Sequence, residues 1–274
     1  MYYRHNLDYK YPEKSDEHMI TVKHVRDVNF DENYPYLQKS RWYKFKRGFY
    51  WLFVNVIAFP ILRLTHGLRI YGRKTLKKYK EQLKNGAITI ANHVFMWDYL
   101  CVMKAVRPRL MFFPAWKTNM EGPNGPAIRI SGGIPVPTEN MRAMVKFKWA
   151  MEEVLESKKW MHFFPEGSLW FYYPDIRPLK KAVFKYAVKF DRPIVPIVMS
   201  FRKRKGITRL FTKKPQVDLH VGEPLFPDKT LTKADAETKL HKTAYQVMQE
   251  MAGVFPGDPT YNEDYLQTDY KSTI

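Results

Sequence analysis

The sequence predicts an α/β protein with a mixed central sheet flanked by helices, preceded by an N-terminal membrane-dipping helical motif. Short apolar runs alternate with amphipathic segments from residue 68 onward, which is typical of strands and helices that alternate along the chain. Two prolines within residues 134–137 restrict that extended run to a sheet edge or a loop. An apolar run at residues 49–62 follows basic and aromatic residues, as in a helix that enters a membrane surface.

The composition supports a folded, strongly basic protein. Of 274 residues, 45% are hydrophobic and 16% aromatic, which allows a sizeable core. The 46 basic and 27 acidic residues give a formal net charge of +19. Such an excess implies an anionic partner: nucleic acid, an anionic bilayer or a phosphorylated substrate.

Cysteine usage and the N-terminal composition indicate the compartment. Cys101 is the single cysteine, so the sequence contains neither an intrachain disulfide nor a metal-type cysteine cluster. This fits a reducing compartment. The first 30 residues are polar and include acids, so we expect no signal peptide.

Composition shifts divide the chain into four expected segments. They are a polar extension at 1–38 with little core of its own, a membrane-associated helical motif at 39–67, an α/β domain at 68–254 and a polar tail at 255–274.

The apolar run at 49–62 predicts a kinked helix or a helix pair that dips into one leaflet. At about 14 residues it is shorter than the ~20 residues that a spanning helix needs, and Asn55 and Pro60 interrupt it. The aromatic residues at its start suit a membrane interface, and the basic residues before it suit anionic head groups. The alternative is a helix buried in the core.

The elements of the α/β domain follow from local patterns. Short apolar runs, and the alternation at 217–221, predict strands, whereas the amphipathic period of 141–155 is typical of a helix. The expected strands lie at 68–71, 87–91, 110–113, 134–137, 160–164, 193–199 and 217–221. The expected helices lie at 74–84, 98–105, within the glycine- and proline-rich stretch 117–131, and at 141–155, 180–190 and 233–251.

His93 and Asp98 are the candidate catalytic residues. His93 follows the buried strand at 87–91, at a strand end where α/β proteins place their chemistry. Five residues along a straight helix correspond to about 140° of rotation, so the two side chains can meet only if the chain turns and the helix begins near Asp98. The carboxylate would then accept the Nδ1 proton and leave Nε2 as a general base. The alternative is a chance spacing.

The stretch 164–168 gives candidate substrate-binding residues. Glu166, Gly167 and Ser168 follow the strand at 160–164; the glycine permits close approach of a ligand, and the carboxylate can accept hydrogen bonds from hydroxyl groups. Ser168 lacks the G-x-S-x-G context of a nucleophile. The alternative is a strand-ending turn with a solvated glutamate.

Lys180 and Lys181 are candidate phosphate contacts. We expect them in the first turn of the helix at 180–190, where free backbone amides also favour an anion. Further along this helix the lysines recur at four-residue steps, which is more typical of a solvated face.

Four blocks of the sequence resemble the glycerophospholipid acyltransferases, in particular bacterial 1-acyl-sn-glycerol-3-phosphate acyltransferases. The resemblance spans about residues 85–225, and the N-terminal membrane-dipping motif also fits it. The blocks are Asn92-His93 with Asp98, Gly132-Gly133-Ile134-Pro135-Val136, Phe164-Pro165-Glu166-Gly167-Ser168 and Val195-Pro196-Ile197-Val198.

The resemblance implies a mechanism. His93, oriented by Asp98, would remove the proton from an acceptor hydroxyl, and that oxygen would attack the thioester of acyl-coenzyme A or acyl carrier protein without a covalent enzyme intermediate. The first amides of the helix after His93 would stabilise the oxyanion, and Glu166 and Gly167 would bind the acceptor. Neither a cofactor nor a metal is implied.

Two departures concern the acceptor's phosphate. The arginine that usually ends the second block is replaced by Thr138, and the arginine after the third block by Leu169. Arg142, Arg177 or Lys180 would have to replace them, or else the acceptor lacks a terminal phosphate.

We therefore expect a monotopic acyltransferase on the cytoplasmic face of a membrane. Its partners would be membrane lipids, an acyl donor and a lysophospholipid acceptor, with 1-acyl-sn-glycerol-3-phosphate as first candidate; the oligomeric state stays open. The alternatives are a non-phosphate lipid acceptor, such as a glycolipid, or a catalytically silent lipid- or nucleic-acid-binding protein. The sequence contains no recognisable nucleic-acid-binding module, so we expect no nucleic-acid partner.

Overall fold

A computed structural model describes residues 3–5, 7–210 and 212–265. The part of the expected C-terminal tail from residue 266 onward lies outside the described residues, as do residues 1–2 and 6 of the expected extension.

A seven-stranded mixed sheet forms the centre of the molecule, in the order β1-β7-β6-β2-β5-β3-β4. The five strands from β6 to β4 run parallel to one another. β7 pairs antiparallel with β6, and β1 pairs parallel with β7. The strand at 134–137, placed at an edge because of its prolines, is the outermost strand β4. The strands are β1 Arg69–Tyr71, β2 Ile88–Ala91, β3 Met111–Trp116, β4 Gly133–Val136, β5 Trp160–Phe163, β6 Ile194–Arg202 and β7 Gln216–Val221.

The helices of the α/β domain agree with the predicted pattern except for the short helix at Ile207–Leu210, which the sequence did not predict, and for three further places. The helix expected at 74–84 ends at Lys78, the stretch 117–131 holds two short helices, and the helix expected from residue 180 begins at Ala182. The helices are α1 Arg41–Phe53, η1 Val54–Ala58, α2 Phe59–His66, α3 Arg73–Lys78, α4 Asp98–Val106, α5 Lys117–Glu121, α6 Gly125–Ser131, α7 Met141–Glu156, α8 Ala182–Lys189, η2 Ile207–Leu210 and α9 Lys233–Met251.

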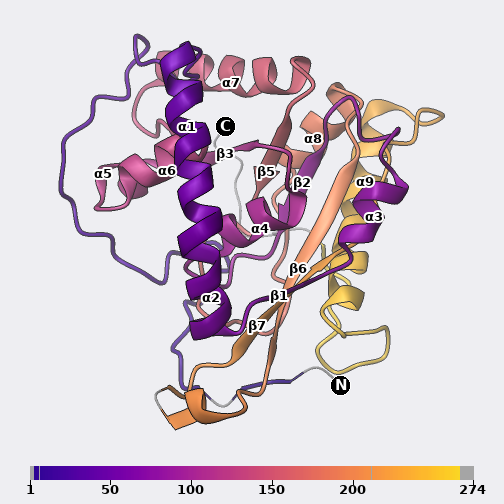
Figure 1. The fold of residues 1–274 in the computed structure, drawn as a ribbon. Helices are drawn as coiled ribbons and strands as arrows, with labels where there is room; N and C mark the ends of the chain where they lie inside the picture. Colours follow the sequence, from indigo (N-terminus) through magenta and orange to yellow (C-terminus); the bar gives the residue numbers. More distant parts are fainter. Residues whose placement is uncertain (1–2, 6, 211, 266–274) are drawn as a thin grey trace.

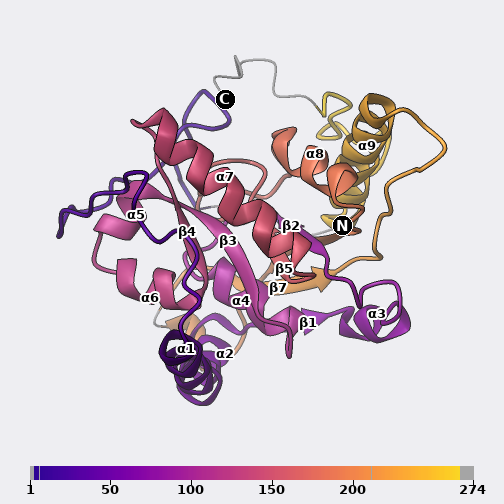
Figure 2. The same cartoon turned by 90° about the horizontal axis from the view of Figure 1, so that it is seen from above.

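Helices cover both faces of the sheet (Figure 2). Because side chains alternate along a strand, Ile88 and Ile90 pack with α7, α8 and α9, whereas Ala91 packs with α2, α3 and α4 on the other face. The predicted α/β class with a mixed, helix-flanked sheet is confirmed.

The N-terminal apolar segment is one rod rather than a helix pair (Figure 1). α1, η1 and α2 form a continuous helix from Arg41 to His66, 26 residues long, which has the length and composition to cross a membrane. Asn55 lies in the π-helical turn η1 and Pro60 lies in the first turn of α2, and the helix breaks at neither residue. One face of the rod packs on the body through Val54, Phe59 and Leu62.

The residues before α1 run along the outside of the body (Figure 1). Phe30 and Tyr36 are buried against the main domain, so this extension contributes to its core. The backbone N–H groups of Val25 and Arg26 both donate to the carbonyl of Glu121, at 3.1 Å each, which fixes the extension beside α5.

Candidate active site

The site lies where β2 and β5, neighbouring parallel strands, end at the same edge of the sheet. His93 comes two residues after β2, and Glu166 three residues after β5. The backbone N–H of His93 donates to Glu166 Oε2 at 3.0 Å, so the two predicted groups meet directly. The loops are also joined by the backbone, since Trp170 donates to the carbonyl of His93 at 3.0 Å.

His93 and Asp98 form a hydrogen-bonded pair. The chain turns after His93, and α4 begins at Asp98, as the sequence predicted. Nδ1 of His93 lies 2.5 Å from Asp98 Oδ2, while the Tyr99 N–H donates to Oδ1 at 2.7 Å. The Asp98 side chain is buried, and that of His93 is 22% exposed. This arrangement leaves the Nε2 edge of the imidazole as the open side of the pair.

The surroundings of Asp98 determine which ring nitrogen carries the proton. Burial raises the pKa of the Asp98 carboxyl, whereas His93 and the N–H groups of Phe95 and Tyr99 oppose that rise. The backbone groups around the carboxyl are donors, so Asp98 accepts from them and also accepts the Nδ1 proton. Nε2 then has a lone pair that can take a proton.

Two aromatic contacts fix the plane of the His93 ring. Phe164 lies parallel to it, with centroids 4.0 Å apart and 12° between the planes. His162 touches Phe164 edge-on at 4.4 Å, and its Nδ1 lies 2.9 Å from Thr89 Oγ1. Burial and the charge of His93 lower the pKa of His162 to about 3, so it is neutral near pH 7. No sequence pattern indicates a role for Phe164 or His162.

Glu166 is held by donors of the protein itself. Arg177 Nη2 lies 2.8 Å from Glu166 Oε2, and the Arg177 backbone N–H donates to Oε1 at 3.0 Å. Both side chains are buried. Arg177 Nη1 also donates to Ser168 Oγ at 2.8 Å. Together with the bond from His93, these contacts make Glu166 the link between the histidine loop and the loop after β5.

Lys180 lies over Gly167. The φ of Gly167 is +87°, and a Cβ built there would come within 2.7 Å of Lys180 Cε. The ammonium group of Lys180 lies 3.4 Å from Asp16 Oδ2. The expected position in the first helical turn is wrong, because Lys181 precedes α8 as its N-cap and Lys180 comes one residue earlier. Lys181 is exposed.

Thr138 and the helix amides complete the predicted set. Thr138 is exposed in the loop after β4.

The first backbone amides of α4 already have hydrogen-bond acceptors within the protein. The Asp98 N–H donates to the Phe95 carbonyl, and the Tyr99 N–H donates to the Asp98 side chain. The expectation that the first helical amides bind the oxyanion is therefore wrong for these two groups. Within the described residues, no group of three His, Cys, Asp or Glu is placed to hold a metal ion.

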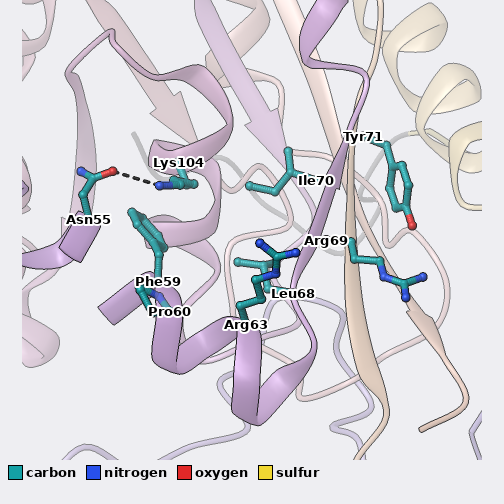
Figure 3. A pocket seen from close by; sticks show the side chains of 9 residues that line it. All are labelled: Asn55, Phe59, Pro60, Arg63, Leu68, Arg69, Ile70, Tyr71 and Lys104. Carbon is teal, nitrogen blue, oxygen red and sulfur yellow. Dashed lines mark hydrogen bonds between the residues drawn. The ribbon is translucent and has the colours of Figure 1, made fainter. Parts of the chain in front are cut away.

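A separate cavity of about 640 Å³ lies between the N-terminal rod, β1 and α4 (Figure 3). In that view Lys104 points toward Asn55, and its Nζ donates to Asn55 Oδ1 at 3.0 Å. None of the predicted site residues lines this cavity. Its lining consists of Asn55, Phe59, Pro60, Arg63, Leu68, Arg69, Ile70, Tyr71 and Lys104.

The region that holds the site is similar to a known family. Residues 67–200 match the model of the Acyltransferase family, a range that contains His93, Asp98 and Glu166. No curated protein sequence matches the chain.

A solved structure shares the fold. The crystal structure of the 1-acyl-sn-glycerophosphate (LPA) acyltransferase PlsC from Thermotoga maritima is 20% identical, with a TM-score of 0.53, and the match covers 79% of this chain and 84% of that chain. The chain is thus similar to the Acyltransferase family over residues 67–200, just under half of its length, and shares its fold with this solved structure.

Proposed function

We propose that the protein transfers an acyl chain from a thioester donor, acyl-coenzyme A or acyl carrier protein, to the hydroxyl of a lysophospholipid. The first candidate for the acceptor is 1-acyl-sn-glycerol-3-phosphate. The observation that carries the proposal is the 2.5 Å contact between His93 Nδ1 and buried Asp98, which leaves Nε2 as the open edge of the ring.

The chemistry requires no nucleophile from the enzyme. Nε2 of His93 takes the acceptor hydroxyl proton as the oxygen attacks the thioester carbonyl, and Asp98 stabilises the resulting imidazolium. The tetrahedral intermediate then expels the thiolate, which receives the proton from Nε2. An ester and a free thiol result, and His93 returns to its neutral form.

The N-terminal rod would place this site at a membrane surface. Nine large apolar side chains along the rod are exposed, from Trp42 to Leu64. The opposite face packs on the protein body, so lipid cannot surround the helix, and we propose that it lies in the plane of one leaflet. Arg41, Lys44 and Lys46 are exposed at its start and would contact anionic head groups on the cytoplasmic face.

A second acceptor class is favoured by the contacts of Arg177. Thr138 and Leu169 replace the expected arginines, and Arg177, a possible substitute, is bonded to Glu166 and Ser168. An acceptor without a terminal phosphate, such as a glycolipid or a monoacylglycerol, therefore remains the alternative substrate.

The test is acyl transfer by purified protein in detergent or vesicles. Labelled acyl-coenzyme A and acyl carrier protein are each combined with a panel of phosphate-bearing and phosphate-free lysolipids, and the products are identified by mass spectrometry. A single new ester with release of one free thiol per turnover is expected. Absence of any acylated product across the panel, from folded protein, would refute the proposed function.

A further inference from the structure

The N-terminal extension crosses the loop after β5, close to the catalytic pair. Tyr11 stacks on Trp170 with ring centroids 5.5 Å apart, and its hydroxyl donates to the carbonyl of Phe171 at 3.0 Å. The Trp170 indole N–H donates to the Glu17 carbonyl at 2.9 Å. The Ser15 carbonyl accepts from Arg177 Nη1 at 2.5 Å. Residues 11–17 thus lie along the loop that carries Glu166 and Gly167.

The residue that follows this segment, His18, lies against β3, the strand next to β5. The imidazole of His18 stacks on Trp116 at the end of β3, with centroids 3.9 Å apart and planes 6° apart. Burial, together with the charges of His93 and Lys180, lowers the pKa of His18, which agrees with its lying near both groups. The extension therefore lies near His93 and Lys180, beside the loop that carries Gly167.

Asp16 is the acidic member of this segment that meets a predicted substrate contact. Its Oδ2 lies 3.4 Å from Lys180 Nζ, and both side chains are about one-quarter exposed, at 25% and 28%. Lys180 in turn lies over Gly167. A phosphate drawn to Lys180 would therefore arrive where a carboxylate of the same chain already lies.

We propose that Asp16 is a specificity-determining residue, which competes with the anionic head group of an acceptor for Lys180. The inference rests on the proposed acyltransferase function and adds a selection step to it. A phosphate-bearing acceptor must separate Asp16 from Lys180 or bind beside two charges that sum to zero. An uncharged acceptor meets no such competition, because it gains nothing from the ammonium group.

Charge removal at Asp16 tests the competition. Asp16→Asn keeps the size of the side chain and removes the carboxylate that lies 3.4 Å from the Lys180 ammonium group. The KM for lysophosphatidic acid should fall about three- to tenfold, since a partly exposed pair and one like-charge repulsion are removed. The KM for monoacylglycerol and both kcat values should stay within twofold.

Asp8→Asn is the matched control. Asp8 belongs to the same extension and is exposed, and the substitution removes the same charge without touching Lys180. It should leave both KM values unchanged, which separates a local effect from a change in net charge. Adding Lys180→Met to Asp16→Asn should abolish the gain for lysophosphatidic acid.

Equal changes in both KM values, or no change in either, would overturn the proposal for Asp16. Direct binding of lysophosphatidic acid and monoacylglycerol by the two variants gives a readout that does not depend on turnover. Selective tightening of lysophosphatidic acid binding in Asp16→Asn would support the proposal even if no acyl transfer occurred, whereas the proposed function would then fail by itself.

Discussion

The imidazole of His93 lies flat on the ring of Phe164, with centroids 4.0 Å apart. This contact joins the loops after β2 and β5 through two side chains, and the bond from the His93 backbone N–H to the Glu166 carboxylate joins them a second time. With the Nδ1 contact to Asp98, three interactions fix the position and plane of the ring. The direction of Nε2 is therefore set before a substrate binds.

The first prediction concerns the general base. His93→Ala should lower kcat about 10²–10⁴-fold because it removes the proposed general base. Asp98→Asn should also inactivate the enzyme, since an amide at this position can donate to Nδ1 and then favours the wrong tautomer. Steady-state rates on the preferred acceptor, with circular dichroism to verify folding, provide the measurement. A folded His93→Ala protein with activity within threefold of wild type would disprove the mechanism.

The second prediction concerns Phe164. An aromatic pair contributes about 0.5–1.5 kcal/mol, so Phe164→Leu should reduce kcat about two- to tenfold by loosening the His93 ring. Phe164→Tyr keeps the stacked ring and should retain most of the activity. The KM for the acceptor should change little in either variant. If Phe164→Leu and Phe164→Tyr show equal rates, the stack has no positioning role.

The third prediction separates a structural from a substrate-binding role for Arg177. Arg177→Gln leaves Glu166 as a buried carboxylate without its cationic partner, which typically costs about 3–5 kcal/mol and should lower Tm by about 6–20 °C. Activity should fall for phosphate-bearing and phosphate-free acceptors alike. A normal Tm with a raised KM for lysophosphatidic acid alone would instead identify Arg177 as a phosphate ligand.

Arg142→Gln provides the control for this comparison. Its partner Glu32 is 3.8 Å away, and the Arg142 side chain is 85% exposed. Exposed pairs contribute at most about 1 kcal/mol, so the Tm should shift by a few degrees or less.

Much of the sheet could be predicted because buried strands show in short apolar runs such as 87–91. The turn between His93 and Asp98 could also be predicted, since the two side chains cannot meet along a regular helix. The helix at 74–84 was predicted too long, because its charged residues after Lys78 form turns that a periodicity argument does not distinguish from helix. The π turn near Asn55 likewise leaves no pattern in hydrophobicity.

The acceptor side of the site was harder to predict because it depends on contacts between distant residues. Arg177 and Glu166 are eleven residues apart. Lys180 contacts Asp16, which belongs to the N-terminal extension. The extension was interpreted as a segment with little core, since its composition is polar. Its aromatic residues, such as Tyr11 opposite Trp170, were the available signal.

The fourth prediction concerns membrane binding by the rod. Phe49, Leu52 and Val56 are each at least 60% exposed on its outer face. Replacing all three by serine should reduce partitioning to vesicles about 100-fold or more, because each apolar side chain contributes about 1.5–3 kcal/mol when buried. High salt should release the wild type only partly, since screening does not affect the apolar contribution. Vesicle flotation measures both effects.

Exposed apolar residues outside the rod provide the control for flotation. Met141 and Trp149 on α7 are 80% and 57% exposed. Replacing both by serine should leave vesicle binding unchanged. Equal losses in the two variants would mean that general surface hydrophobicity, rather than the rod, binds the bilayer.

The last prediction is that stability falls as the solution is acidified below about pH 6.5. Two buried histidines are responsible: burial lowers the pKa of His162 to about 3 and that of His241 to about 4, from an ordinary value of 6.5. Between these values the unfolded chain binds more protons than the folded chain, so stability is present above pH 6.5 and is lost toward pH 4. Each histidine should contribute a slope of up to about 1.4 kcal/mol per pH unit in that window.

Urea unfolding at pH 7, 6 and 5 measures the slope of the unfolding free energy against pH. His162→Gln should reduce the slope by the contribution of one titrating group, up to about 1.4 kcal/mol per pH unit. Thr89→Val removes the hydroxyl that lies 2.9 Å from His162 Nδ1 but no titrating group, so it should retain the full slope. An unchanged slope in His162→Gln would mean that His162 is protonated in the folded protein, contrary to its buried position.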